Sequence, residues 1–154
     1  AIDPNILVYG EGWQQFDGDS DSGLDKTDMA SQGYLYKMKD DWVGAFNDTF
    51  RDGMKGSVFD SADKGYVQLA TEDDLTGFSS LKKDVYYGLT GTYDQTTGAG
   101  NTYVATSDSG IGASIAYVEC HDNLTLHDKL AVSTGDTDLL DDQISLANDT
   151  LLSS

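Results

Sequence analysis

Apolar residues gather in three short runs, and these runs predict three strands. Asn5–Tyr9 is an apolar run of strand length that stops at Gly10. Runs of this kind are typical of strands buried on both faces of a parallel sheet. Residues 42–46 (Trp-Val-Gly-Ala-Phe) predict a second strand, and Ser114–Glu119 predicts a third.

Helical spacing appears between and after these strands. Asn47-Asp48 predicts the cap of a short helix that runs through Met54. Asp73-Asp74 predicts the start of a longer helix, and Asp138 predicts the start of a last one. The apolar positions of these two helices are Leu75, Phe78, Leu81, Val85 and Leu89, and then Leu139, Ile144, Leu146, Leu151 and Leu152. Strands alternating with helices favour an α/β fold of parallel βαβ units.

Two polar stretches predict loops. Residues 14–33 are dominated by Gly, Asp, Ser and Gln, and residues 92–109 by Thr, Gly, Ser and Asp. No proline-rich linker divides the 154 residues, so we expect one domain without an internal boundary. A complete (β/α)₈ barrel needs about 250 residues, which is more than this chain has.

The net charge of the chain restricts the classes of ligand that it can bind. The chain has 27 acidic and 9 basic residues, for a formal net charge of −18. A surface this acidic repels phosphates and anionic membranes, which argues against nucleic-acid binding. It suits a neutral substrate, cations, or simple solubility. No apolar run approaches the roughly 18 residues that a membrane span requires.

Cys120 is the single cysteine, so neither an intrachain disulfide nor a cysteine-based zinc site is expected. A thiol protease would need Cys120 and His121 to meet, but adjacent strand residues point to opposite faces. We therefore expect Cys120 to be a small buried side chain rather than a nucleophile.

Two strand ends each place a carboxylate beside an aromatic or imidazole ring. The first is Tyr9-Gly10-Glu11-Gly12-Trp13 and the second is Glu119-Cys120-His121-Asp122-Asn123. In parallel barrels the loops that follow the strands carry the chemistry. A carboxyl group against an indole is partly desolvated, which favours its protonated form and suits Glu11 to general acid catalysis. The alternative for Glu11 is an ordinary loop glutamate.

The second motif has two interpretations. Strand alternation would put His121 and Asn123 on one side and Asp122 on the other, unless the strand end turns there. A polar triplet at a strand end can hydrogen-bond several hydroxyls of a sugar ring. The alternative is a cap for the next helix, with Asn123 bonding backbone amides.

The acidic segment Asp17–Asp28 is similar to a calcium-binding loop, with acids at positions 1, 3, 5 and 12. However, Gly23 stands at position 7 rather than 6, and position 12 is Asp28 rather than a bidentate glutamate. We therefore expect a solvated acidic loop and keep calcium binding as the alternative.

With these motifs placed, the chain resembles part of the catalytic barrel of the alpha-amylase superfamily, glycoside hydrolase family 13. Within it, the chain is most similar to the type I pullulanases, which debranch alpha-1,6-linked glucans. The resemblance rests on Tyr9-Gly10-Glu11-Gly12-Trp13, on Val43-Gly44-Ala45-Phe46-Asn47-Asp48-Thr49-Phe50-Arg51-Asp52-Gly53 and on His121-Asp122-Asn123, in this order and spacing.

The resemblance implies a partial (β/α)₈ TIM barrel from about strand five to helix seven, with residues 1–154 truncated at both ends. It also implies retaining hydrolysis of branches in pullulan, starch or glycogen. Glu11 matches the general acid/base, Asp122 the transition-state stabiliser and His121 a hydrogen-bond donor to the sugar. Trp13 and Asn123 are expected to bind substrate.

The resemblance places the nucleophile of the family on barrel strand four, ahead of the matched motifs. We therefore expect the isolated chain to be inactive and to need the missing barrel strands as partners. No metal ligand is assigned among the site residues and no cofactor is required. The competing hypothesis is a non-catalytic acidic module that binds glucan or calcium. Asp, Ser and Thr richness with few bases favours an extracellular or cell-surface location.

Overall fold

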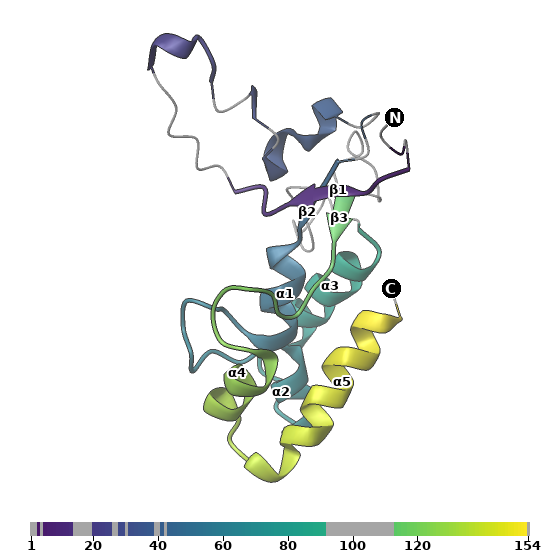
Figure 1. Ribbon diagram of the computed structural model, residues 1–154. Coiled ribbons are helices and arrows are strands. Elements are labelled where there is room, and N and C mark those ends of the chain that lie inside the picture. Colours follow the sequence, from purple (N-terminus) through teal and green to yellow (C-terminus); the bar gives the residue numbers. More distant parts are fainter. Residues whose placement is uncertain are drawn as a thin grey trace.

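The computed structural model describes residue 3 and residues 5–13, 20–25, 28–29, 31–38, 41, 43–91 and 113–153. Three short strands form a parallel sheet in the order β1-β2-β3 (Figure 1). They are β1 (Val8–Gly10), β2 (Val43–Phe46) and β3 (Ser114–Ile115). Tyr9 pairs with Gly44, and Ala45 pairs with Ser114. The predicted mixture of helices with a parallel sheet is therefore confirmed.

The end of β2 leads directly into helix α1 (Asp48–Lys55) through Asn47, as the sequence predicts. Asn47 is fully buried, and its side-chain oxygen accepts a hydrogen bond from the backbone N–H of Phe50 at 2.9 Å. This bond satisfies one of the N–H groups that a helix start leaves unpaired. The other side-chain atom of Asn47, Nδ2, donates to Ser114 Oγ at 3.1 Å, which ties the helix start to β3.

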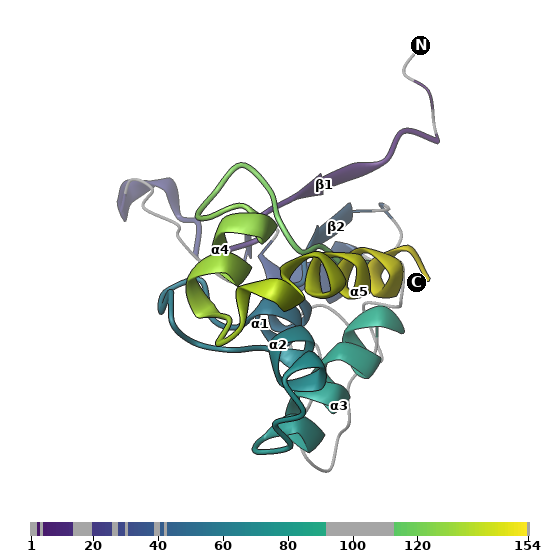
Figure 2. The ribbon, with the colours of Figure 1, turned by 90° about the horizontal axis from the view of Figure 1, so that it is seen from below.

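The main core lies among the helices that follow. These are α2 (Tyr66–Thr71), α3 (Phe78–Leu89), α4 (Leu126–Ser133) and α5 (Leu140–Leu152). Both views show the helices gathered beside one another on one side of the small sheet (Figure 2). The buried core residues are Phe50, Met54, Val67, Val85, Val118, Leu126, Leu130 and Ala147. Short 3₁₀ segments cover Ser20–Ser22, Gln32–Met38 and Thr137–Leu139.

The strands differ from the prediction in length and burial. β1 begins at Val8 rather than at Asn5, and it is exposed rather than buried on both faces. The exposed fractions are 61% for Leu7 and 49% for Val8. β1 is an edge strand with β2 as its single neighbour in the described sheet, which explains the exposure. β3 stops at Ile115 rather than at Glu119 because its partner β2 ends at Phe46.

The helices also differ from the prediction in places. The helix expected from Asp73 begins at Phe78 instead, because the Asp74 carboxylate accepts a hydrogen bond from Thr76 N and closes a turn there. Leu75 is consequently 71% exposed. Helices α2 and α4 were missed, and the last helix begins at Leu140 after one 3₁₀ turn. Leu152, expected on its apolar face, is 82% exposed.

Some of the predictions concern residues that the structure does not describe. The predicted loop at 92–109 lies outside the described residues, and so do residues 14–19, 26, 27 and 30 of the predicted 14–33 loop. Within the described residues, none of the helices combines the length and the apolar character that crossing a bilayer requires.

A buried lysine on α4 holds the loop between α1 and α2. Lys129 is 2% exposed, and its ammonium group donates to the carbonyl oxygens of Asp60 at 2.7 Å, Ser61 at 3.1 Å and Asp63 at 2.7 Å. Burial lowers the pKa of Lys129, while the nearby Asp63 and Asp60 carboxylates act in the opposite direction. Charge-assisted bonds to three carbonyls therefore offset the desolvation of the ammonium group.

Replacing Lys129 by methionine should lower the free energy of unfolding by about 2–4 kcal/mol, because three hydrogen bonds to a charged donor are lost together. Urea unfolding followed by circular dichroism measures this change. Lys82→Met is the control, because Lys82 is exposed on α3 and its loss should change stability by less than about 0.5 kcal/mol. Equal effects of the two substitutions would contradict the assigned role of Lys129.

Candidate functional site

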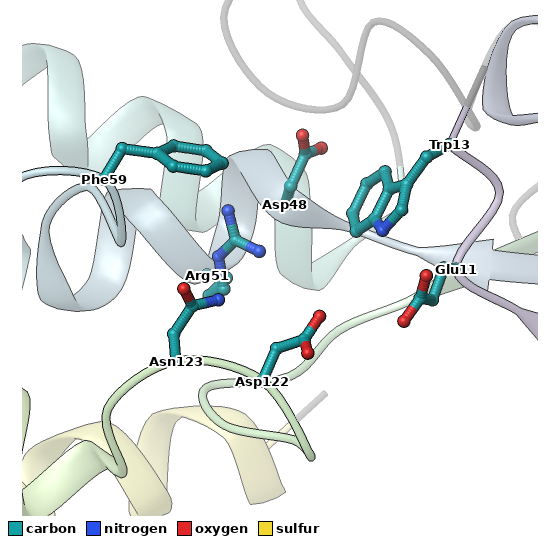
Figure 3. Close-up of a pocket in the computed structure, with 7 residues that line it drawn as sticks. All are labelled: Glu11, Trp13, Asp48, Arg51, Phe59, Asp122 and Asn123. Carbon is teal, nitrogen blue, oxygen red and sulfur yellow. The ribbon is translucent and has the colours of Figure 1, made fainter. Parts of the chain in front are cut away.

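A pocket of about 420 Å³ opens where the ends of β1 and β2 meet the turn after β3. Figure 3 shows the side chains of Glu11 and Trp13 on one side of it, and those of Phe59 and Arg51 on the other. The lining residues are Glu11, Trp13, Asp48, Arg51, Phe59, Asp122 and Asn123. Four of the five predicted site residues therefore line one pocket, although they come from segments distant in the sequence.

The fifth predicted residue, His121, joins the two predicted catalytic carboxylates. Its Nε2 lies 2.8 Å from Glu11 Oε1 and 3.6 Å from Asp122 Oδ1. The side chains remain accessible, with exposed fractions of 39% for Glu11, 65% for His121 and 53% for Asp122. Two carboxylates and one imidazole are therefore close enough together to contact the same molecule in the pocket.

Gly12 and Gln32 determine where Glu11 and Trp13 lie. Gly12 has a φ of +69°, a conformation that residues with a Cβ rarely adopt, and a Cβ there would stand 2.7 Å from the Cβ of Ala45 on β2. Gln32 is buried and donates its backbone N–H to the Gly12 carbonyl at 2.7 Å. Its side-chain amide donates to the carbonyl of Phe46 at the end of β2. The Glu11–Trp13 turn is therefore held against the end of β2.

The second motif is a turn rather than a strand end. Asn123 has a φ of +65°, and residues 116–125 form no strand. The alternation expected for His121, Asp122 and Asn123 is therefore wrong, because the chain turns and presents Asp122 and Asn123 to the same pocket. Cys120 is exposed, so the expectation of a buried side chain is also wrong.

Glu119, which precedes this turn, has a structural role. Its carboxylate accepts a hydrogen bond from Leu126 N, at the start of α4, and Thr125 Oγ1 accepts one from Asp128 N. A helix does follow the motif, but the expected cap by Asn123 is wrong: Thr125 is the N-cap of α4, and Glu119 accepts from its first N–H.

Arg51 is a pocket residue that the sequence analysis did not assign. It is 7% exposed, donates from Nε to Asp52 Oδ1 at 2.6 Å and from Nη1 to the Tyr117 hydroxyl at 2.7 Å. Burial alone would lower the pKa of Arg51, but the adjacent Asp52 carboxylate and Tyr117 hydroxyl raise it. Burial raises the pKa of Tyr117 to about 12. A permanently charged guanidinium therefore forms one wall of the pocket.

A sequence signal for this wall was present. Asp48 and Arg51 lie three residues apart on α1, and residues at that spacing share one face of a helix. The spacing of Asp48 and Arg51 in the motif Val43–Gly53 therefore indicates that both side chains share one face. Phe59, which is 90% exposed on the loop after α1, carried no periodic signal.

Comparison with known proteins relates the chain to a segment of pullulanases. The pullulanase of Bacillus subtilis (strain 168) is 30% identical over 128 residues, which are 83% of this chain and 15% of that protein. Pullulanase A of Streptococcus pneumoniae is 28% identical over 133 residues, which are 86% of this chain and 9% of that protein. The chain therefore spans less than a fifth of the length of these relatives. No family model matches it.

Solved structures agree with the sequence comparison. The apo pullulanase of Paenibacillus barengoltzii matches 99% of this chain and 20% of that chain, with a TM-score of 0.70 and 31% identity. The pullulanase of Anoxybacillus sp. LM18-11 complexed with maltotetraose matches 99% of this chain and 19% of that chain, with a TM-score of 0.70 and 28% identity. The predicted similarity to a segment of pullulanases is confirmed.

Substituting Gly12 by alanine should destabilise the chain through both its backbone and its surroundings. The left-handed conformation costs an alanine about 1–2 kcal/mol, and the contact with Ala45 adds about 1–3 kcal/mol. Gly23→Ala is the matched control, because Gly23 has the same φ of +69° but nothing within 4 Å of the added Cβ. Urea unfolding of both variants separates the two costs. Equal losses would show that Gly12 is not packed against β2 as described.

Proposed function

We propose that the chain is a portion of a retaining, pullulanase-like glycoside hydrolase that cleaves alpha-1,6 glucosidic branches in pullulan, starch or glycogen. One observation carries the proposal: Glu11 and Asp122, from distant segments, face one pocket and both approach the His121 imidazole. Retaining glycoside hydrolysis uses an acid/base carboxyl group and a nucleophilic carboxylate; Glu11 fits the first of these roles, and Asp122 is a further carboxylate on the same pocket. The relation to pullulanases supports the same reaction.

Each site residue has its own role in the proposed hydrolysis. Glu11 donates a proton to the leaving glycosidic oxygen and later activates water as general base. Asp122 holds ring hydroxyls and stabilises the positive charge that develops on the sugar in the transition state. His121 hydrogen-bonds the same sugar, and its Nε2, which lies 2.8 Å from Glu11 Oε1, orients the Glu11 carboxylate. Trp13 supplies an apolar face and Asn123 an amide for sugar hydroxyls.

Glucan is the substrate class that suits the pocket walls. Trp13 on one side and the exposed Phe59 on the other present aromatic rings (Figure 3), and such rings pack against the apolar face of a sugar. Related pullulanases have been solved with maltotetraose and with maltohexaose and alpha-cyclodextrin. The net charge of −18 favours a neutral ligand over an anionic one.

We further propose that the described sheet is part of a (β/α)₈ barrel, from about strand five to helix seven. Its three strands are parallel and two of them are followed by helices, the arrangement of a barrel segment. β1 is an edge whose neighbourhood exposes Ile6, Leu7, Val8 and Tyr9 at 49–61%. An apolar edge of this kind is a surface that another strand covers, and the missing barrel strands of a parent chain are the partner we propose.

The proposed chemistry needs no cofactor. Calcium binding by the 17–28 segment is retained as a proposal; residues 17–19, 26 and 27 of that segment lie outside the described residues. An extracellular or cell-surface location is retained likewise. The non-catalytic glucan- or calcium-binding module is not favoured, because the relatives are enzymes.

The proposal predicts that the purified chain alone does not hydrolyse pullulan, because the acid/base and stabiliser are present without a nucleophile. Mixing it with a separately expressed segment of the Bacillus subtilis pullulanase that carries the preceding barrel strands should restore reducing-sugar release. Activity from the chain alone would contradict the assignment of the missing strand.

In the mixed system, Glu11→Gln should lower the rate by about 10²–10⁴-fold, since a general acid contributes that much. Asp128→Asn is the control, because Asp128 pairs with His127 on α4 and does not line the pocket; its rate should stay within about twofold. A Glu11→Gln rate equal to that of the unchanged chain would remove Glu11 from the mechanism.

A further inference from the structure

Three metal-ligating atoms converge on the mouth of the pocket, one each from Glu11, His121 and Asp122. Each residue offers one ligand atom, and these atoms all lie within 4.8 Å of one another. His121 Nε2 is 2.8 Å from Glu11 Oε1 and 3.6 Å from Asp122 Oδ1. In a tetrahedral zinc site with metal–ligand distances of about 2.0–2.2 Å, neighbouring ligand atoms stand about 3.3–3.6 Å apart. The 3.6 Å between His121 and Asp122 falls at the upper end of that range, and the 2.8 Å between His121 and Glu11 is shorter than its lower end.

We propose that Glu11, His121 and Asp122 together bind one divalent transition-metal ion of the zinc class, with water in the remaining coordination position. One imidazole with two carboxylates is a ligand set that zinc, cobalt and copper accept. Calcium and magnesium prefer all-oxygen shells with more ligands. The sequence alone does not predict a metal at these residues, because Glu11 is distant from His121 in the sequence and strand alternation would place His121 and Asp122 on opposite faces.

The surroundings favour a cation at this point. The whole chain carries a formal charge of −18, and two of its carboxylates belong to the cluster itself. The three side chains are 39–65% exposed, so an ion can enter and keep a bound water without rearrangement of the core. An ion bound to Glu11 after β1 and to His121 and Asp122 after β3 would also link two segments that are distant in the sequence.

Metal binding opposes glycoside hydrolysis. An ion bound to the Glu11 carboxylate occupies the oxygen that would carry the donated proton, and it fills the pocket mouth between Glu11 and Asp122. We therefore expect zinc to compete with oligosaccharide. The metal site stands without the proposed function, whereas this competition rests on it.

The chain contains its own control for the imidazole. His127 is the second of two histidines, and its Nδ1 lies 3.0 Å from Asp128 Oδ1. That pair belongs to no group of three ligating side chains within the described residues. Cys120, exposed and next to His121 in sequence, is a competing soft ligand that needs a control of its own.

Co²⁺ titration of the full chain tests the site, since cobalt substitutes for zinc and gives visible absorption bands that depend on its ligands. We expect saturable binding at one ion per chain, displaced by Zn²⁺. His121→Ala, Glu11→Gln and Asp122→Asn should each weaken it at least about tenfold, because even outer partners of a metal contribute about 10–100-fold. His127→Ala and Cys120→Ser should leave the affinity within about twofold.

Several results would overturn the metal site. They are the absence of saturable Co²⁺ absorption, an affinity of His121→Ala equal to that of the unchanged chain, or a loss in Cys120→Ser that shows a thiolate ligand. Circular dichroism of every variant verifies folding, and the two conservative amide variants keep the test valid if His121→Ala unfolds. A second readout is maltotriose titration of the Co²⁺-loaded chain. Displacement of cobalt is expected, whereas cobalt retained alongside bound maltotriose would overturn the glucan assignment of this pocket and leave the metal site intact.

Discussion

The buried side chain of Asn47 connects the elements that position much of the site. It accepts from Phe50 N to start α1 and donates to Ser114 on β3, while its own N–H donates to the Ile115 carbonyl at 2.9 Å. One residue thus fixes the end of β2, the start of α1 and the end of β3 in relation to one another. The pocket residues on α1 and in the turn after β3 follow from this connection, whereas Glu11 and Trp13 come from the end of β1. Leaving such buried polar groups unpaired would cost about 1–3 kcal/mol each, so this connection has one favourable arrangement.

A second set of polar contacts carries this geometry to the pocket. Arg51 on α1 reaches Tyr117 on the segment after β3, and Gln32 holds the Gly12 backbone to the end of β2. The Glu119 carboxylate closes the turn that presents Asp122 by capping α4. Each contact joins a segment that carries a pocket residue to another element of the fold. The exposed carboxylates of the site are therefore supported by buried hydrogen bonds, although they have few packing contacts of their own.

The sequence allowed much of this to be predicted, and the misses have physical causes. The cap at Asn47 and the parallel strand pairs follow from local rules, and so does the grouping of acids at strand ends. The short strands were overestimated, because strand length depends on a partner's length rather than on apolar character. The predicted burial of β1 is wrong, because an apolar run does not show whether its strand lies at the edge of the sheet. Gly12 and Asn123 both have a positive φ, and strand alternation does not predict the turns in which Glu11, His121 and Asp122 lie. Whether the strands belong to a barrel, and which residues act in catalysis, remain proposals that rest on the resemblance and on the pocket.

The central claim is that the cluster of Glu11, His121 and Asp122 is a glucan site, and the two histidines allow a direct measurement. Nitrogen-correlated NMR of the imidazole rings, recorded during a maltotriose titration, gives one set of signals for His121 in the pocket and one for His127 on α4. The account predicts that the His121 signals move in a saturable manner while those of His127 stay in place. Unchanged His121 signals at a maltotriose concentration that shifts other resonances of the chain would contradict it.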